Sequence, residues 1–334
     1  MSALRVAVVG TGWIAGKHLA ALTAQPGVEV VAVADAVRER AEEVAGSVGA
    51  RAYDDGLTLL AEEELDAVWL CVPPFAHGPL EQAAVSRSLP FFVEKPLALD
   101  LDTAVEVAAG VRERGLLTAV GYHWRHLDVV EQARAVLQSA PAPAQLLNGF
   151  WLDRTPPAAW WRRRGRSGGQ VLEQTTHVFD LARVLVGEVD QVFAVESATP
   201  RAAFPDADAP TASVATLHFT SGALGTISST CVLGWRHRVG VHVLAESTAV
   251  ELVERSLVDH ELRVVTGAGD TAVTTSDEDP VAREDREFLA AVRGEVAQVT
   301  APYEDALRTH ALAYAADRAA REGVPVRPAD LLRA

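Results

Sequence analysis

The chain has 334 residues, of which 49% are hydrophobic and 22% charged, enough for two domains with separate cores. A formal net charge of −15 argues against a nucleic-acid or anionic-membrane partner. No apolar stretch is long enough to span a bilayer and no secretory signal fits before the first strand, so we expect a cytoplasmic protein. Cys71 and Cys231 lie in apolar runs, which indicates reduced core thiols, and no metal site is predicted.

The first elements are predicted to be a strand, Leu4–Val9, a glycine turn, and a helix, Trp13–Leu22. Gly10 permits the tight turn, and Gly12 lets a pyrophosphate approach the backbone N–H groups at the helix start. Trp13 and Ile14 begin that helix. The pattern predicts a dinucleotide-binding turn, with all four of these residues in contact with the cofactor.

A second apolar run, Val28–Ala34, ends in Asp35. A carboxylate at the end of this strand can bond a ribose 2′-OH and repels a 2′-phosphate. We therefore predict NAD in preference to NADP, although Arg38 and Arg40 lie near enough in sequence to soften the preference.

The alternation of strands and helices in the first third predicts a doubly wound parallel sheet, a Rossmann domain over residues 1–122. The later strand-like stretches follow one another with short turns and predict a second domain, residues 123–334, with a large open, mostly antiparallel sheet. The fold class is thus α/β. Its further predicted strands are Ala67–Val72, Phe91–Val93, Thr118–Gly121, Gln191–Ser197, Ser213–Phe219, Ala223–Val232, Val239–Ala245, Ala249–Val253 and Leu262–Val265, and its closing helices are Val281–Val292 and Tyr303–Arg321.

Two short segments follow strands of the first sheet, where ligands of open α/β sheets bind. In Glu94-Lys95-Pro96, the lysine can present its ammonium group to a substrate oxygen; a surface ion pair is the alternative. The segment Pro73-Pro74-Phe-Ala-His77 follows the predicted strand Ala67–Val72, and its histidine is interpreted as a cofactor contact or a helix-start residue.

A third segment, Ser167 to Asp180, is predicted to form one helix, because Ser167 and Gln170 have the spacing of a capping box. On that helix Glu173, His177 and Asp180 would share a face. A carboxylate one turn from a histidine can raise its basicity and orient it as a proton acceptor. A purely structural histidine is the alternative.

Two tryptophans stand beside cations in Trp160-Trp161-Arg162. Aromatic planes beside cations can hold a nicotinamide, a sugar face or an anion. A solvated basic loop is the alternative.

Taken together, these motifs resemble the Gfo/Idh/MocA oxidoreductases over nearly the whole chain. They are Gly10-x-Gly12-x-x-Ala15, Pro74 to His77, Glu94-Lys95-Pro96, Gly121-Tyr122-x-x-Arg125, Trp161-Arg162 and Gly168-Gly169…Glu173…His177…Asp180. The resemblance implies oxidation of a sugar or polyol hydroxyl, or reduction of a keto-sugar.

The resemblance also implies residue roles. Lys95 and His177 would be catalytic, with Glu173 beside them in place of the usual aspartate. The predicted cofactor contacts in addition to the glycine turn and Asp35 are Pro73, Pro74, His77, Glu94, Lys95, Trp161 and Arg162, and the predicted substrate contacts are Lys95, Tyr122, His123, Arg125, Trp161, Glu173 and His177.

The functional hypothesis is an NAD-dependent dehydrogenase in which His177 accepts the hydroxyl proton and Lys95 polarises the reacting oxygen. A redox-neutral lyase or glycosidase that acts through transient oxidation is an alternative. A non-enzymatic NAD-binding sensor is another, although the presence of both Lys95 and His177 argues against it. We also expect a homodimer or homotetramer, because the second sheet has too few helices to cover both faces.

Overall fold

The computed structural model describes residues 3–267 and 269–333, and the chain divides into two compact units. One unit contains the chain up to His123 together with Val281–Leu307, and the other contains Trp124–Pro280 and the chain from Arg308 onward. The helix predicted at Val281–Val292 therefore belongs with the first sheet, whereas the sequence pattern placed it in the second domain.

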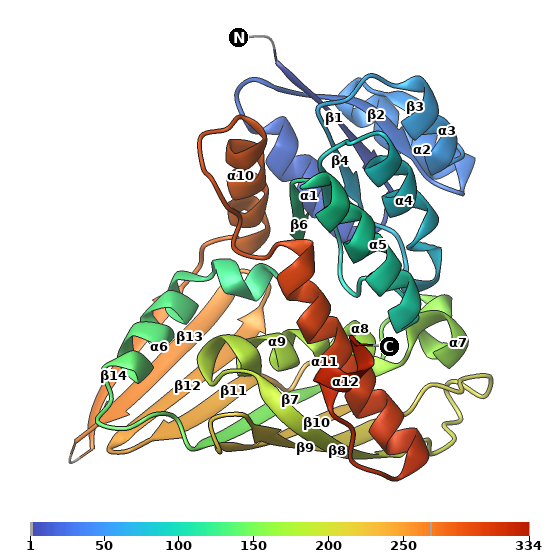
Figure 1. Ribbon diagram of the computed structural model, residues 1–334. Helices are drawn as coiled ribbons and strands as arrows, with labels where there is room; N and C mark the ends of the chain where they lie inside the picture. Colours follow the sequence, from blue (N-terminus) through green and yellow to red (C-terminus); the bar gives the residue numbers. More distant parts are fainter. Residues whose placement is uncertain (1–2, 268, 334) are drawn as a thin grey trace. The chain divides into compact units, whose positions relative to one another are not determined.

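The first unit is built on a parallel six-stranded sheet in the order β3-β2-β1-β4-β5-β6 (Figure 1). Both faces are covered, which is why its central strands are largely apolar. The strands are β1 (Leu4–Val9), β2 (Val28–Ala34), β3 (Arg51–Tyr53), β4 (Ala67–Leu70), β5 (Phe91–Val93) and β6 (Thr118–Val120). The helices are α1 (Trp13–Thr23), α2 (Arg38–Val48), α3 (Gly56–Glu62), α4 (Pro79–Ser86), α5 (Leu101–Arg114) and α10 (Pro280–Val292), with the 3₁₀ turn η1 (Pro74–Ala76).

The strand order reverses beside β1, which pairs with β2 on one side and β4 on the other. In open α/β sheets the ligand crevice lies at this reversal, outside the carboxyl ends of the strands. The first unit therefore has the predicted Rossmann topology. Only the short edge strand β3 was absent from the prediction.

The second unit is built on an eight-stranded sheet in the order β14-β13-β12-β11-β7-β10-β9-β8. Its neighbouring strands are antiparallel except for β7 and β10, which are parallel. Its strands are β7 (Leu146–Arg154), β8 (Val189–Ser197), β9 (Ala212–Phe219), β10 (Leu224–Leu233), β11 (Arg238–Ala245), β12 (Thr248–Ser256), β13 (Asp259–Thr266) and β14 (Asp270–Ser276). The mostly antiparallel sheet is as predicted. Of β7, only the placement of Trp151 on a strand was anticipated, and β14 was not anticipated.

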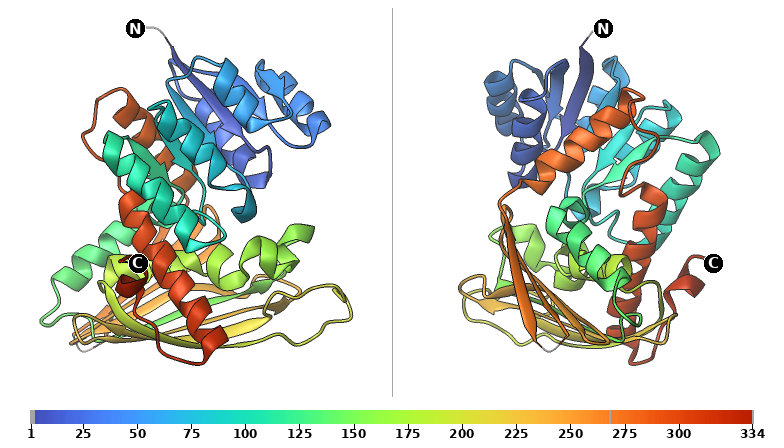
Figure 2. Two further views of the ribbon diagram at one scale, coloured as in Figure 1. Left: turned by 45° about the vertical axis from the view of Figure 1, so that its right-hand side comes forward. Right: turned by 90° about the vertical axis from the view of Figure 1, so that its left-hand side faces the viewer.

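Helices of the second unit lie on one face of this sheet (Figure 2). Val178 of α9, for example, stands against the strand residue Gly149, where a Cβ would collide with it. Among the described residues no helix covers the opposite face. The remaining helical segments are η2 (His123–His126), α6 (Asp128–Gln138), η3 (Ala159–Arg162), α7 (Arg164–Ser167), α8 (Gln170–Glu173), α9 (Thr176–Leu185), α11 (Tyr303–Glu322) and α12 (Pro328–Leu331).

The single helix predicted from Ser167 to Asp180 is wrong in two respects. First, the helix is interrupted between α8 and α9. There the N–H of Thr175 bonds the carbonyl of Gln170, and the N–H of His177 bonds the carbonyl of Gln174. Second, there is no capping box, because Gly169 is the N-cap residue and the Ser167 hydroxyl accepts from the N–H of Gly169 instead.

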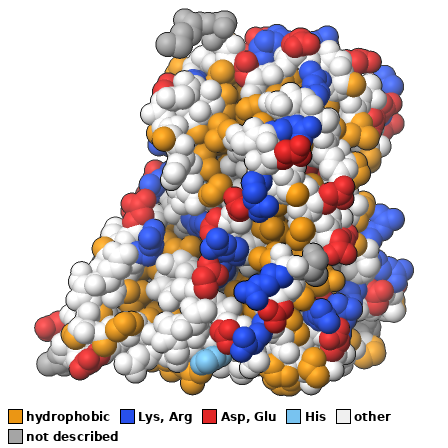
Figure 3. Space-filling model, in the orientation of Figure 1, with side chains coloured by type: hydrophobic (Ala, Val, Ile, Leu, Met, Phe, Trp, Pro, Cys, Tyr) orange, Lys and Arg blue, Asp and Glu red, His pale blue; other side chains and the backbone are white. Residues whose placement is uncertain are grey.

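The surface carries charges of both signs, and Figure 3 shows acidic and basic side chains interspersed over the visible face. No helix among the described residues has the length and apolar character needed to cross a membrane.

Candidate functional site

The glycine turn after β1 has the geometry that a dinucleotide phosphate requires. Gly10 has a φ of 90°, and a Cβ there would collide with the carbonyl of Cys71 at the end of β4. At Gly12 a Cβ would meet nothing within 4 Å, so the space beside this backbone is open. Gly12 provides no side-chain cap to α1, which leaves the first-turn N–H groups for an anion.

Asp35, at the end of β2, accepts four hydrogen bonds. Its Oδ2 accepts bonds from the N–H and hydroxyl of Thr11 at 3.0 and 2.7 Å, and its Oδ1 accepts from Val37 N–H and from Arg40 at 2.8 and 2.9 Å. Burial acts to raise the pKa of Asp35, but the bonds from Val37 and Thr11 and the charge of Arg40 outweigh it and lower the pKa. Asp35 is therefore an anion at neutral pH. Arg38 instead contacts Glu42 and Asp54.

His77 is buried at the end of the segment that follows β4, beyond the buried Pro74 of η1. Its Nδ1 lies 2.6 Å from Oε1 of Glu81, whose other oxygen accepts from the N–H of Gly78 at 2.5 Å. Its Nε2 is buried and has no hydrogen-bond partner among the described residues. An orphaned buried polar atom is a candidate ligand contact, so the structure is compatible with a cofactor contact at His77.

Glu94 and Lys95 follow β5, at the carboxyl end of the strand, where the segments after β1, β2 and β4 also begin. The Glu94 side chain is buried and turned inward: Oε1 lies 3.2 Å from Nε2 of His18, and Oε2 accepts from the Lys95 N–H at 3.1 Å. A Cβ at Gly121 would collide with this carboxylate, so the glycine after β6 makes room for it. Lys95 itself is half-buried.

In the second unit, the ring of His177 lies in a cluster of parallel aromatic rings. Its centroid is 5.8 Å from Trp124 and 5.9 Å from Trp151, and the two indoles are 5.8 Å apart. The three interplanar angles are between 14° and 29°. His177 is 3% exposed. The indoles therefore fix the plane of its ring, a role that sequence could not assign to them.

Trp161 and Glu173, both predicted substrate contacts, lie against each other. The buried indole of Trp161 donates from Nε1 to Oε2 of Glu173 at 2.6 Å. The guanidinium of Arg162 lies over the ring of Phe204, 4.9 Å from its centroid. Trp161 and Arg162, which precede the glycine pair, therefore pack against other side chains and are not part of a solvated loop.

The other predicted substrate contacts are buried in their own units. Tyr122 and His123 are at most 7% exposed. Arg125 forms a two-pronged ion pair with Asp180, at 2.7 and 2.5 Å, and Asp180 also accepts from the hydroxyl of Thr309 at 2.6 Å. Asp180 therefore serves as the partner of Arg125, and its predicted position on one helical face with Glu173 and His177 does not hold, because the helix is broken between α8 and α9.

Two residues near His177 could not have been found from sequence. The carboxylate of Glu254 on β12 accepts from Nε1 of Trp124 and pairs with Arg236 at 2.5 Å. Arg236 also lies over the ring of Trp151, 5.4 Å from its centroid. Glu254 thus contacts the indole of Trp124, and Arg236 contacts that of Trp151. Both residues come more than 80 positions after Trp151 in the sequence, and no local motif marks them.

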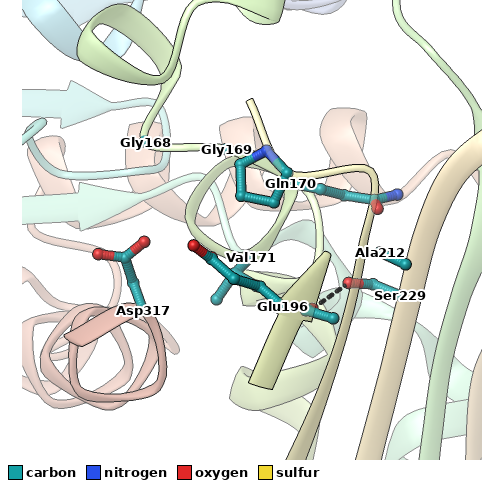
Figure 4. Close-up of a pocket in the computed structure, with 10 residues that line it drawn as sticks. Gly168, Gly169, Gln170, Val171, Glu196, Ala212, Ser229 and Asp317 are labelled. Atoms are coloured by element: carbon teal, nitrogen blue, oxygen red, sulfur yellow. Dashed lines mark hydrogen bonds between the residues drawn. The ribbon is translucent and has the colours of Figure 1, made fainter. Parts of the chain in front are cut away.

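The glycine pair before α8 closes one side of a small cavity (Figure 4). Gly168 and Gly169 have φ values of 71° and 83°, a conformation that other residues rarely adopt. The cavity measures about 10 Å³, room for roughly one water molecule. It is too small for a sugar. Its lining includes Gln170, Glu196, Ser213, Ser229 and Asp317.

Comparison with known proteins supports the assignment of both units. A family profile described as "Oxidoreductase family, NAD-binding Rossmann fold" matches residues 4–122, and the GFO/IDH/MocA C-terminal domain profile matches residues 144–250. The inositol 2-dehydrogenase of Rubrobacter xylanophilus is 31% identical over 257 residues, which are 75% of this chain and 71% of that protein.

Solved structures show the same architecture. A putative myo-inositol dehydrogenase from Sinorhizobium meliloti is 26% identical, with a TM-score of 0.80 over 97% of this chain and 99% of that one. Levoglucosan dehydrogenase in complex with NADH and L-sorbose has a TM-score of 0.88 at 20% identity, over 98% and 99% of the two chains; that likeness concerns the fold alone. Since the two profiles cover most of both units, the chain belongs to the Gfo/Idh/MocA family of oxidoreductases with an NAD-binding Rossmann domain.

Proposed function

We propose that this protein is an NAD-dependent dehydrogenase that oxidises a secondary hydroxyl of a sugar, polyol or inositol-like compound, or reduces the corresponding ketone. The observation that carries the proposal is the fixed, buried ring of His177 in a chain whose first domain belongs to an NAD-binding family. Relatives named inositol 2-dehydrogenase favour a cyclic polyol as the substrate class.

The cofactor is proposed to bind at the carboxyl ends of the strands in the first unit. The N–H groups after Gly12 would bind the pyrophosphate, and Asp35 would accept a hydrogen bond from the adenosine ribose. Nε2 of His77 would accept a hydrogen bond from a donor group of the cofactor. When bound, NAD supplies the hydride acceptor for the oxidation. The open space beside Gly12 and the orphaned Nε2 of His77 fit such a ligand.

In the proposed reaction, His177 accepts the proton of the substrate hydroxyl as a general base. Proton transfer requires a base held within hydrogen-bond reach of the proton it takes. The rings of Trp124 and Trp151 restrict His177 to one plane, which lowers the cost of reaching that geometry.

Lys95 is proposed to donate a hydrogen bond from its ammonium group to the same substrate oxygen. The oxygen gains negative charge as its proton leaves, so a fixed cation stabilises the transition state more than the bound alcohol. Glu173, held by Trp161, is proposed to accept a bond from a neighbouring hydroxyl of the substrate.

The proposal is tested by incubating the purified chain with NAD and a panel of inositols, sugars and sugar acids, and following NADH formation. We expect at least one cyclic polyol to give stoichiometric NADH and ketone. Release of a free sugar without NADH would favour redox-neutral cleavage instead, and NAD binding without any turnover would favour the sensor alternative.

A further inference from the structure

A chain of buried hydrogen bonds connects the helix α10 to the segment that carries Lys95. Asp285 of α10 lies 2.8 Å (Oδ1) and 3.0 Å (Oδ2) from Nδ1 of His18 on α1. Nε2 of His18 lies 3.2 Å from Oε1 of Glu94, whose Oε2 accepts from the Lys95 N–H. The three linking side chains are at most 4% exposed.

The arrangement indicates a charged histidine. An ionised carboxylate only accepts hydrogen bonds, and both ring nitrogens of His18 face carboxylates. Burial acts to lower the pKa of His18, but the charge of Asp285 and the hydrogen bonds that the ring makes to Asp285 and Glu94 outweigh it and raise the pKa well above 6.5. Burial also raises the pKa of Asp285, and the charge of His18 and the hydrogen bonds from His18 and Trp69 oppose that rise. The geometry favours one imidazolium between two buried carboxylates.

The surroundings hold this histidine rigidly. The indole of Trp69 donates to Oδ1 of Asp285 at 2.7 Å, the ring of Phe92 lies 4.9 Å from that of His18, and Phe288 packs edge-on against Trp69 at 5.2 Å. All of these residues belong to the first unit. A side chain with so many fixed contacts can transmit its position to the groups that it binds.

We infer that His18 and Asp285 are positioning residues, which fix the Glu94 carboxylate and through it the backbone from which Lys95 extends. The inference rests on the proposed function of Lys95. Glu94 thus acts inward, as the link between His18 and the Lys95 N–H, rather than through its carboxylate on the cofactor. Removal of His18 would leave the Glu94 carboxylate buried without its cation, a destabilised state, and we expect the carboxylate to shift from its present position.

The same cluster has spacing that could suit a metal ion, because His18, Glu94 and Glu284 offer ligand atoms within 4.8 Å of one another. A metal would need a neutral, free ring nitrogen, whereas both nitrogens of His18 already lie against carboxylates. The imidazolium of His18 supplies the positive charge that a metal ion would supply at this position. We therefore expect activity to be unchanged after dialysis against a chelator.

A double-mutant cycle tests whether His18 acts through Lys95. The four full-length proteins are the wild type, His18→Gln, Lys95→Ala and the double variant, assayed with the best substrate of the panel. A displacement of about 1 Å at a reacting group can cost about 10²-fold, so we expect His18→Gln to lower kcat by about tenfold to a hundredfold. In the Lys95→Ala background the same change should alter kcat by no more than about twofold.

Two further measurements separate positioning from loss of folding. NAD affinity, measured by calorimetry, should be unchanged in His18→Gln. Glu63→Gln is the matched control, because Glu63 is a buried carboxylate of the same unit that pairs with Arg51 and Tyr53; its kcat should equal that of the wild type. If His18→Gln does not fold, Asp285→Asn keeps the ring and an acceptor and takes its place in the cycle.

The outcomes are distinguishable. An equal loss of kcat from His18→Gln in both backgrounds would overturn the positioning role alone, as would wild-type kcat in a folded His18 or Asp285 variant. Full activity of Lys95→Ala would refute the proposed role of Lys95 and, with it, this inference.

Discussion

The two proposed catalytic residues are held in different ways. His177 is fixed by stacking, because two indoles lie parallel to its ring, whereas Lys95 is a half-buried side chain on a segment whose backbone is bonded to Glu94. The ring therefore has little freedom left to lose when substrate binds. We therefore expect changes around His177 to affect its alignment directly and changes around Lys95 to act through the backbone.

We predict that Lys95→Ala and His177→Ala each keep NAD binding but lower kcat. Loss of a positioned acid or base costs about 10²- to 10⁴-fold. NAD affinity by calorimetry and initial rates by NADH absorbance check this. His218→Ala, which removes an exposed histidine on β9, is the control with wild-type rates. Full activity in a folded variant would remove that residue from the mechanism.

We predict that Trp161→Phe raises the KM for substrate or the Kd for NAD without unfolding the chain. The change keeps a ring but removes the donor to Glu173, and a hydrogen bond to a charged group contributes about 1.5–3 kcal/mol. The expected change is about tenfold or more. Trp235→Phe, at a position 61% exposed, is the control. Unchanged constants in folded Trp161→Phe and Trp161→Ala would show that Trp161 only packs.

Local motifs mark some of the candidate site residues in the sequence. Gly10, Asp35 and Lys95 each follow a strand, and His177 follows a glycine pair, so the sequence around them was enough to propose them. Glu254, Arg236 and Asp285 have no such signal, because the aromatic ring or histidine that each contacts, Trp124, Trp151 and His18, is more than 80 residues away in sequence. Only the folded chain brings them together.

At the scale of elements, burial decided which predictions succeeded. The first sheet is covered on both faces, so its central strands are largely apolar and were located closely, whereas the exposed edge strand β3 was missed. β14 was also missed, because it consists mostly of exposed threonine, alanine and aspartate, a composition typical of a loop. The predicted helix through Ser167 to Asp180 failed at Gln174 and Thr175, where the N–H of Thr175 bonds the carbonyl of Gln170 and the regular helical pattern ends. A β-branched residue such as Thr175 also has a lower helix propensity than an unbranched one.

We predict that NAD is preferred over NADP because Asp35 is an anion at the end of β2, and that Asp35→Ser lowers the ratio of kcat/KM for NAD to that for NADP by at least about tenfold. Arg40 pairs with Asp35 and could reach a 2′-phosphate once that carboxylate is gone. In the Asp35→Ser background, Arg40→Ala should therefore weaken NADP more than NAD. Equal or better efficiency of the wild type with NADP would contradict the preference.

At the scale of the whole molecule, the second sheet has one face without a covering helix among the described residues (Figure 2). Apolar side chains stand on that face: Val195, Val214 and Leu224 are 53%, 47% and 56% exposed. A contiguous apolar surface of this kind commonly marks an interface. The sequence pattern suggested such a face, but only the register of β8, β9 and β10 shows which side chains share it.

We predict a homodimer or homotetramer formed through this face. Light scattering at micromolar concentration should give at least twice the chain mass, and a Val214→Lys, Leu224→Lys double variant should shift the mass toward the monomer. Val37→Lys, at an exposed apolar site of the first unit, is the control and should leave the mass unchanged. A monomeric wild type would contradict the prediction.

The central claim is that the chain oxidises a carbinol carbon with NAD as the acceptor, and transfer of an isotopic label tests it most directly. A substrate from the panel carrying deuterium on the reacting carbon is turned over, and the NADH and the ketone are analysed by mass spectrometry. The account predicts one deuterium in the NADH for each ketone formed, with slow turnover in Lys95→Ala and His177→Ala. Product that forms without labelled NADH would contradict it.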